Sequence, residues 1–361
     1  MADLVNLTPV TLRGPYVRRS SLFTFAILSV IVITPSSYSQ TTVYGGRGLM
    51  RTFTAETVGK SQFFISSFFQ TFFIPTEKRS SALGKDHTLS LGFTLGLNHS
   101  MELTILAVPY QDDQQHVWGP PGDTQIGLKA TLPVRLGAIA TGVRGYVSIP
   151  TAKNHNVRFE PYSSDKVGAG LVGIVTADMT ESFPLVPLKL NFNFGYMDHS
   201  LNGNFFIDEE DQFILGAGLK FPIRSFILYT EYSGEVFANN AAITYAENST
   251  RITQGLKFLG PWNMIFDCAV DIGLDQPLSP EQRASIYQKD YADWKVILGV
   301  NYQASFGSRN SQAKKAAKKA EDKQLQQELE TIRRTREGAQ DTLQDMENSL
   351  QEKKPKDGEK P

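Results

Sequence analysis

Residues 122–151 read GDTQIGLKATLPVRLGAIATGVRGYVSIPT, which is the pattern of a β-hairpin. Apolar side chains recur at every second position of its first half: Ile126, Leu128, Ala130 and Leu132. A period of two is that of a β-strand. Residues 133–137 then predict a tight turn, and residues 138–149 predict a second strand with Arg144 and Ser148 on its polar face.

A hairpin with one apolar face fits two classes of protein. In a soluble sandwich the apolar face packs on a core. In a transmembrane barrel the apolar face meets lipid and the polar face lines a lumen. The rest of the chain has to distinguish between them.

The same period recurs along most of the chain and predicts twelve strands. We expect them at residues 59–74, 87–98, 100–110, 123–133, 138–149, 167–178, 187–198, 211–221, 225–236, 250–259, 262–273 and 294–306. The strands at 59–74 and 167–178 are apolar or small on both faces, so the pattern does not orient them.

The connections between these strands alternate in length. The short ones are 98–100, 133–137, 179–186, 222–224 and 260–261. The longer and more polar ones are 75–86, 111–122, 150–166, 199–210, 237–249 and 274–293. This alternation is typical of an outer-membrane barrel, which has short periplasmic turns and long external loops. We therefore predict an all-β fold, a 12-stranded antiparallel transmembrane barrel spanning residues 59–306.

The two faces of the strands agree with this prediction. Aromatic residues recur near strand ends, as interfacial girdles require: Phe73, Tyr196, Phe221, Phe226, Phe258, Trp262, Trp294 and Phe306. The inward faces carry charges of both signs, which predict lumen-lining residues: Lys129, Arg144, Lys189, Lys220, Glu231, Glu235, Lys257, Asp267, Asp271 and Lys295. From Lys220 onward, with Arg251 included, these charges alternate in sign from strand to strand, so they can pair across strands. A soluble sandwich with a solvated outer face remains the alternative.

The bulk properties exclude several classes. The chain has 361 residues and a formal net charge of −1, so nothing indicates nucleic acid as a partner. Its single cysteine, Cys268, excludes an intramolecular disulfide and a multi-cysteine metal site. A mean hydropathy of −0.24 argues against a helical membrane protein.

Residues 1–39 predict a secretory signal peptide. Arg18 and Arg19 precede the apolar run 22–34, and small residues favour cleavage after Ser39. An uncleaved anchor helix is the alternative, but the run is short for crossing a membrane. Residues 40–58 would then form an N-terminal lead-in to the barrel. A signal peptide followed by a barrel predicts a Gram-negative outer membrane.

Residues 307–361 predict a periplasmic helical tail. Apolar residues recur at alternating spacings of four and three: Leu325, Leu329, Ile332, Ala339, Leu343, Met346 and Leu350. The spacing fits a coiled coil, and a single charged helix is the alternative because Arg336 and Gly338 interrupt the seam. Residues 313–352 could bind a periplasmic partner or self-associate, and the charged end at 353–361 is expected to be disordered.

The stretch from Gly122-Asp123 to Ile149-Pro150-Thr151 resembles the outer-membrane barrel family named for the meta-pathway of phenol degradation. The shared pattern is Gly-Asp, an alternating strand, a tight turn and a strand that ends in Pro-Thr; Ala152 stands where the family usually has glycine. Gly299, Tyr302 and Phe306 also look like the aromatic-ended signal that the barrel-assembly machinery recognises. The resemblance implies a transporter for small, often hydrophobic compounds, and it supplies no binding residues.

No catalytic or phosphate-binding motif is present, so we expect neither an enzyme nor a cofactor. His199-Ser200 could be imagined as half of a hydrolytic pair, but neighbouring residues on a strand point to opposite faces. Acidic residues cluster in two predicted loops, where solvation is a simpler explanation than a bound cation: Asp112, Asp113, Asp208, Glu209, Glu210 and Asp211.

The sequence therefore predicts an outer-membrane barrel embedded in lipid that acts as a passive transporter or channel for small compounds. The alternative is a structural or scaffold barrel whose tail binds a periplasmic partner or the cell wall.

Overall fold

The structure is a computed structural model. It describes residues 40–75, 83–111, 119, 121–152, 165–180, 187–201, 203, 208–223, 225–276, 287–289 and 293–306. The predicted signal peptide and the whole of the predicted tail lie outside the described residues. The chain divides into two compact units, Met1–Ala304 and Ser305–Pro361.

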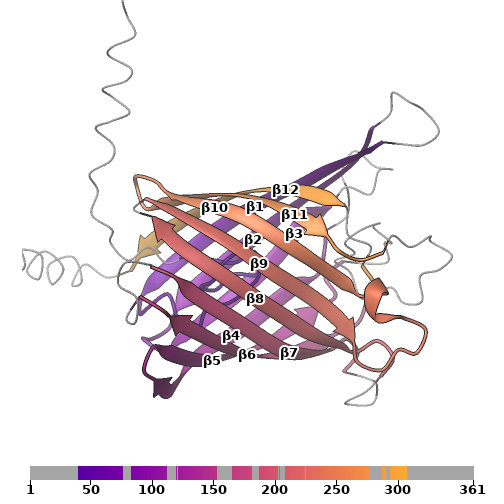
Figure 1. Ribbon diagram of the computed structural model, residues 1–361, viewed down its shortest axis with the longest axis horizontal. Helices are drawn as coiled ribbons and strands as arrows, with labels where there is room; N and C mark the ends of the chain where they lie inside the picture. The colour runs from indigo at the N-terminus through magenta and orange to yellow at the C-terminus, as the bar shows by residue number, and fades with distance from the viewer. Residues whose placement is uncertain are drawn as a thin grey trace, which may run out of the picture. The chain divides into compact units, whose positions relative to one another are not determined.

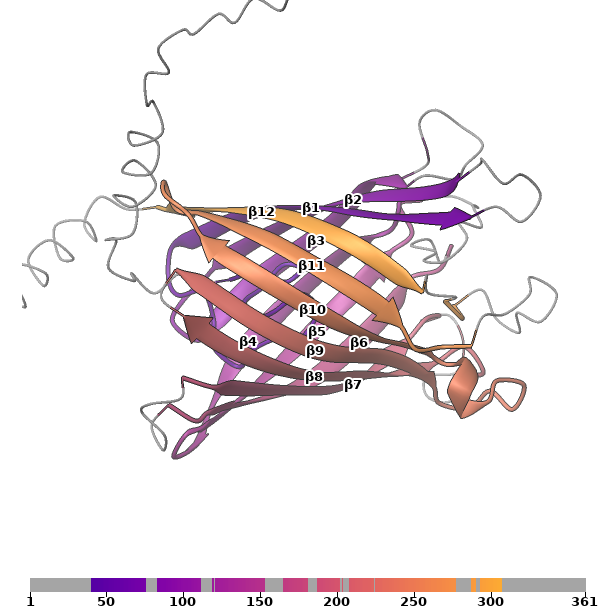
Figure 2. The ribbon, with the colours of Figure 1, turned by 45° about the horizontal axis from the view of Figure 1, so that its top comes forward.

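The first unit is a closed barrel of twelve strands (Figures 1 and 2). The strands are β1 (Gln62–Pro75), β2 (Leu83–Gly96), β3 (Met101–Gln111), β4 (Thr124–Leu136), β5 (Ile139–Ile149), β6 (Gly168–Asp178), β7 (Lys189–Asp198), β8 (Gln212–Ile223), β9 (Phe226–Phe237), β10 (Ser249–Leu259), β11 (Met264–Gly273) and β12 (Trp294–Ser305). Each is hydrogen-bonded to its neighbours in chain order, and β12 closes the barrel on β1. Pairing is antiparallel throughout the described ladders, so the predicted barrel and its strand count are confirmed. A short 3-10 helix, η2 (Tyr245–Glu247), precedes β10.

The hairpin in residues 122–151 turns later in the chain than its sequence predicts. β4 continues through Pro133 to Leu136, so the predicted turn at 133–137 is wrong. A register irregularity between Thr131 and Arg135 accommodates Pro133, which has no N–H to give to the ladder. The turn is made by Gly137 and Ala138, and Gly137 adopts a φ of 57°, which glycine tolerates.

One pair of connections breaks the predicted alternation of lengths. β1 and β2 continue to pair as far as Pro75↔Leu83, so residues 76–82 alone connect them. The connection between β6 and β7, residues 179–188, is longer than that. We call the end of the barrel that carries 179–188 and the four tight turns the short-turn rim, and the opposite end the long-loop rim. β1 and β2 extend past the other strands at the long-loop rim (Figure 1).

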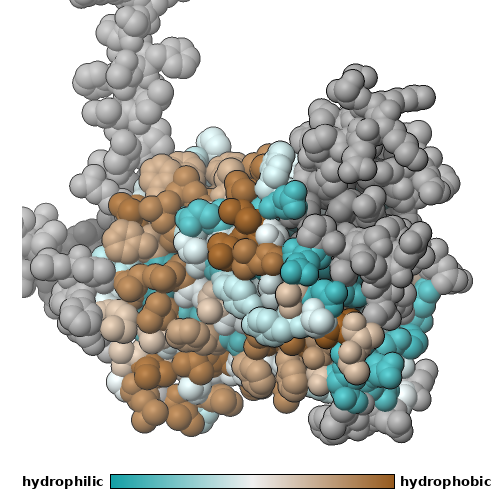
Figure 3. All heavy atoms as spheres, turned by 45° about the vertical axis from the view of Figure 1, so that its right-hand side comes forward, coloured by the Kyte–Doolittle hydropathy of each residue, from teal (hydrophilic) through white to brown (hydrophobic). Residues whose placement is uncertain are grey.

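The outer wall is apolar. Large hydrophobic side chains from most of the strands are exposed on it, among them Ile126, Leu128, Leu171, Phe194, Leu219, Leu256, Phe266 and Leu298. Figure 3 shows brown side chains across much of the wall, with teal ones gathered toward one end. Exposed aromatics mark strand ends at Phe226, Trp294 and Phe306, and Trp262 in the β10–β11 turn is 81% exposed. The described part of the chain contains no helix with the length and apolar character needed to cross a membrane.

The interior is filled by the chain itself. Residues 40–58, which the sequence presents only as a lead-in, lie inside the barrel and are almost entirely buried. We call this segment the plug. One core cluster joins plug and wall: Val43, Leu49, Met50, Phe68, Tyr229, Ala269 and Ile297. Phe64 and Phe68 are fully buried, which shows which face of β1 points inward, where the sequence pattern gave no orientation.

Candidate functional site

The plug is a compact folded segment. Thr41 bridges to Arg47 and Gly48 bridges to Phe53 as isolated antiparallel pairs, and Val43 N donates to Met50 O at 2.8 Å. Gly45 and Gly46 make the turn with φ of 73° and 80°, values that side chains rarely allow. These internal bonds hold the plug in one shape, so the barrel wall faces a defined surface.

Glu231 of β9 holds a different part of the plug, residues 50–52. Its carboxylate accepts three consecutive backbone N–H groups, from Met50 at 3.2 Å, Arg51 at 2.8 Å and Thr52 at 3.1 Å. Successive N–H groups that converge on one point form an anion-binding nest. The buried carboxylate and the three buried amides therefore satisfy one another.

Arg51 fixes the plug to the next two strands. Its guanidinium donates to both carboxylate oxygens of Asp271 on β11, at 3.1 and 2.6 Å, and to Thr253 Oγ1 on β10 at 3.2 Å. A planar fork that meets a carboxylate at two points gives both strength and a fixed geometry.

On the opposite wall, a buried ion pair holds the middle and the C-terminal end of the plug. Lys129 of β4 and Glu102 of β3 are 2.8 Å apart and fully buried. Lys129 Nζ also donates to three plug carbonyls, those of Arg47, Thr54 and Glu56. Glu102 accepts the N–H groups of Arg47 at 2.8 Å and Val58 at 2.7 Å. These extra bonds give both buried charged groups further hydrogen-bond partners, which a buried ion pair needs to be tolerated.

Further bonds surround the plug. Asn193 of β7 exchanges two hydrogen bonds with the backbone of Phe53, and Thr176 of β6 accepts from Ala55 N at 2.9 Å. Thr41 Oγ1 lies 2.6 Å from Ser66 Oγ of β1 and donates to Asn301 Oδ1 of β12 at 2.5 Å. The plug is thus attached to strands on all sides of the lumen.

Small inward residues make room for the plug on β8. A Cβ placed on Gly218 would lie 2.5 Å from Leu49 Cδ1, and one on Gly216 would lie 3.4 Å from Thr52 Oγ1. The plug therefore fits against a wall that carries no side chains at these positions.

Gly218→Val should weaken docking of the plug by about 1–3 kcal/mol, the usual cost of overpacking, while the barrel still folds. The measurement is maleimide labelling of a Thr52→Cys reporter in a Cys268→Ala background, since Cys268 itself is exposed. Labelling should accelerate. Gly145→Val is the matched control, because a Cβ there meets only Leu171 at 4.0 Å. Equal acceleration in both variants would contradict the fit.

Glu56 carries an electrostatic contact at the end of the plug. Its carboxylate lies 2.6 Å from Arg47 Nη2 and 3.2 Å from Lys189 Nζ, and Lys189 also pairs with Asp178 at 2.5 Å. Burial alone would raise the pKa of Glu56, but the charges of Arg47, Lys189 and Lys220 outweigh it, so that pKa lies below its ordinary value.

This shift predicts a plug that loosens in acid. A lowered pKa in the docked plug means that the ionised carboxylate favours docking above the undocked pKa of about 4.3. That contribution is lost as the pH falls through the docked pKa. Hydrogen exchange of the buried plug amides, corrected for its intrinsic pH dependence, should therefore accelerate below about pH 4, and Glu56→Gln should remove the part of this pH dependence due to the carboxyl. Exchange that slows as the pH falls, with Glu56→Gln behaving like the original protein, would contradict the assignment.

The structure places the predicted lumen-lining residues in two groups. Lys129, Lys189, Glu231, Lys257 and Asp271 form hydrogen bonds with the plug. The others are inward-facing or line a cavity beside the plug: Arg144, Lys220, Glu235, Asp267 and Lys295. Cross-strand pairing occurs between Lys257 and Asp267, and Arg251 lies 4.0 Å from Asp271. Glu235 instead pairs with Lys289 from the β11–β12 connection. That these residues determine which solutes cross the lumen stays a prediction.

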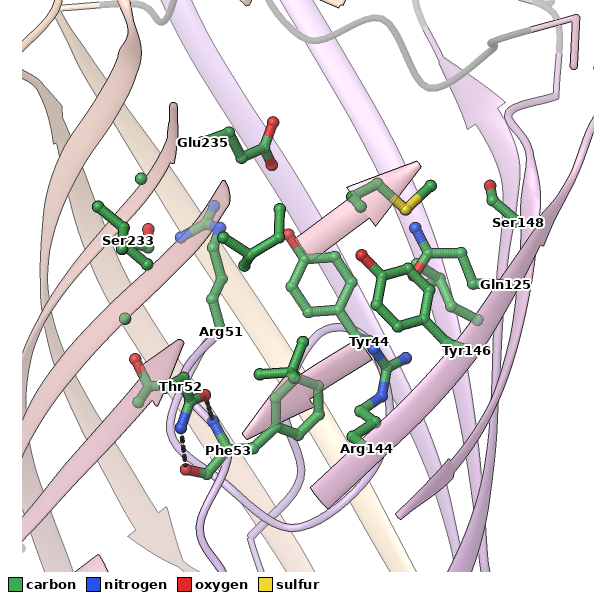
Figure 4. Close-up of a pocket in the computed structure, with 18 of the residues that line it drawn as sticks. Tyr44, Arg51, Thr52, Phe53, Gln125, Arg144, Tyr146, Ser148, Ser233 and Glu235 are labelled. Carbon is green, nitrogen blue, oxygen red and sulfur yellow. Dashed lines mark hydrogen bonds between the residues drawn. The ribbon is translucent and has the colours of Figure 1, made fainter. Parts of the chain in front are cut away.

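The cavity lies on the long-loop side of the plug and has a volume of about 140 Å³. One wall is aromatic and the other is charged (Figure 4). The aromatic wall includes Tyr44 and Phe53 of the plug and Tyr146 of β5; the charged wall includes Arg51, Glu235 and Arg251. The cavity is therefore amphipathic, like sites that bind small organic molecules.

Arg144 combines the charged and the aromatic character of the cavity, because its guanidinium lies against aromatic rings. Its guanidinium lies 4.7 Å from the centre of the Phe53 ring and 4.3 Å from that of Tyr146, both within cation–π range. Figure 4 shows it directed toward the rings of Tyr44 and Tyr146.

His199 also lines the cavity. Its Nε2 lies 2.8 Å from Gln212 Oε1, and its ring stacks on Tyr287 with centroids 4.0 Å apart. Burial lowers the pKa of His199, and the bond to Gln212 opposes that shift only in part. The ring is thus a packed, neutral part of the wall, and Ser200 is engaged separately through its N–H with Asp198.

Sequence reasoning missed the residues that the plug contributes, above all Tyr44, Arg51 and Phe53, because 40–58 has no strand period. It also missed Lys289, which lies in a long connection. Within the described residues no group of three or more His, Cys, Asp or Glu side chains is placed to hold a metal ion.

A scan of family models and a search of curated proteins give no match. The chain is similar in structure to the KdgM porin, with a TM-score of 0.42 and 8% identity over 67% of this chain and 99% of that one. It is also similar to an outer-membrane channel from Pseudomonas putida F1, with a TM-score of 0.47 and 8% identity over 75% and 100%. The CymD monoaromatic hydrocarbon channel gives 0.37 and 9% over 69% and 89%. Likeness this distant carries no argument about function, so the functional conclusion rests on the geometry of the site.

Proposed function

We propose that this protein is an outer-membrane channel for passive movement of small compounds, closed by its own N-terminal plug. The observation that carries the proposal is the amphipathic cavity beside the plug, inside a barrel whose outer wall is apolar. Passage through the lumen then requires the plug to move.

The apolar outer wall supports a membrane location. In a soluble barrel, exposed leucine and phenylalanine on most strands would form a large aggregation-prone surface. In lipid the same surface is solvated, and a closed barrel leaves no strand edge without hydrogen-bond partners. The predicted signal peptide and the aromatic strand ends favour the outer membrane, with the short-turn rim facing the periplasm.

The polar contacts of the plug support movement over permanent filling. Its attachments are hydrogen bonds and ion pairs to Glu231, Asp271 and Lys129. Water can replace such bonds when the plug leaves, whereas exposing an apolar core would be costly. The apolar contacts of the plug form two small clusters, one with Val43, Leu49 and Met50 and the other with Phe53 and Ala55.

A structural barrel is the second candidate. The packing of the plug against the whole lumen wall favours it, because a permanently filled lumen passes nothing. In that case the tail, with residues 313–352, would supply the function by binding a periplasmic partner or by self-association. The resemblance to the meta-pathway family favours transport.

Liposome swelling separates the two candidates. Full-length protein refolded into liposomes should admit small solutes faster than empty liposomes, with uptake falling as solute size increases. A protein without its 307–361 tail should behave in the same way. Swelling at the rate of empty liposomes, with and without the tail, would overturn the channel and favour the structural barrel.

A further inference from the structure

Arg144 differs from the other cations of the cavity in lacking a polar partner. It is 2% exposed, and its Nε and Nη2 atoms have no hydrogen-bond partner among the described residues. Arg51, by comparison, meets Asp271 at two points, and Lys289 meets Glu235 at 2.6 Å. A buried charge with unsatisfied donors is costly unless something else satisfies it.

The nearby carboxylate of Glu102 is already engaged. One of its oxygens accepts from Lys129 and from Arg47 N, and the other accepts from Val58 N. Of the described charged residues that line the cavity, four are cationic, Arg51, Arg144, Arg251 and Lys289, and two are anionic, Asp123 and Glu235. The lining therefore carries an excess of positive charge, and Arg144 is its uncompensated member.

The surroundings of Arg144 are shaped for a compact apolar body. Tyr44, Phe53 and Tyr146 line the same part of the cavity, and Figure 4 shows the two tyrosine rings beside the guanidinium. A cavity of about 140 Å³ is close to the roughly 150 Å³ known to hold benzene. Gly127 of β4 keeps the strand beside the guanidinium clear, since a Cβ there would lie 3.0 Å from Nη2.

We propose that the cavity binds a small aromatic carboxylate, with its carboxylate on Arg144 and its ring against Tyr44 and Tyr146. A carboxylate matches the planar guanidinium fork and neutralises the charge of Arg144. The aromatic rings contribute ring-to-ring contacts. The proposal names a solute class for the channel proposed above, but binding itself does not require passage.

Calorimetric titration of the full-length protein with benzoate tests the proposal. Benzyl alcohol tests the ring without the charge, and acetate tests the charge without the ring. Benzoate should bind more tightly than either. Arg144→Met should weaken benzoate binding by at least about tenfold, the effect of losing a charge-assisted pair. It should leave benzyl alcohol unchanged. Lys166→Met, which removes an exposed cation from a loop, is the matched control and should stay close to the original protein.

Three results would overturn the proposal: no benzoate binding by the original protein, equal binding by Arg144→Met, or acetate binding as tightly as benzoate. If Arg144→Met does not fold, Arg144→Lys serves as the test variant. Its ammonium keeps the charge but lacks the planar fork, so benzoate binding must still weaken. Binding without liposome swelling would contradict the channel and keep the site. Liposome swelling without benzoate binding would keep the channel and contradict the benzoate site.

Discussion

Deletion of residues 42–56 should convert a barrel with rare openings into one that conducts steadily. These residues occupy the lumen and contact strands all around it. Without them, the inward side chains of a 12-stranded barrel leave a polar path, because the lumen of such a barrel is wider than the filled interior of an 8-stranded one. Single-channel recording in planar bilayers measures the change, and we expect a severalfold larger time-averaged current.

Replacing residues 42–56 with a glycine–serine linker of equal length is the matched control for this deletion. The linker keeps the chain continuous but removes the specific contacts of residues 42–56, so it should open the channel as well. Conductance that stays at the level of the intact protein in both variants, with the barrel shown to be folded by its heat-modifiable mobility, would contradict a plugged channel.

Glu231→Ala should release the plug from a barrel that remains folded. The substitution leaves the N–H groups of Met50, Arg51 and Thr52 without their acceptor. Each buried amide left unpaired costs about 1–3 kcal/mol, so the docked plug would lose several kcal/mol in total. The ladder is untouched, because the backbone of Glu231 still pairs with Gly218 and Thr253.

The measurement is labelling of Thr52→Cys by a membrane-impermeant maleimide in the Cys268→Ala background. Thr52 is 1% exposed, so the docked plug should protect the reporter and Glu231→Ala should expose it. Glu235→Ala removes the same group from the same strand, but its carboxylate pairs with Lys289 and not with the plug. Protection that survives Glu231→Ala would show that this carboxylate does not hold the plug.

The barrel could be predicted from the sequence because its strands carry a local signal. Alternation along β7, β8 and β12 is nearly unbroken, and each strand needs only its own side chains to show which face is apolar. The ends were less predictable: Pro133 suggested a turn that β4 passes through by an irregularity in its register. Such an irregularity depends on the partner strand, which a local pattern does not contain.

The plug could not be predicted in the same way. Residues 40–58 show neither the apolar periodicity of a strand nor that of a helix. Their conformation depends on partners far along the chain, such as Glu231 and Asp271. The alternating pattern did identify Glu231 and Asp271 as inward charges, but it predicted partners for them only on neighbouring strands. A usable signal was the row of inward glycines, Gly216 and Gly218, since a lumen wall has little reason to lack side chains unless something packs against it.

A reversible lock on the plug tests whether solute flux depends on movement of the plug. Thr41 Oγ1 lies 2.6 Å from Ser66 Oγ, so cysteines at both positions, with Cys268→Ala, should form a disulfide between plug and wall. Solute flux into liposomes is then measured on the same preparation, oxidised and after reduction. We predict background flux when oxidised and restored flux when reduced. Solute entry that is equally fast in both states would contradict a channel that opens by movement of its plug.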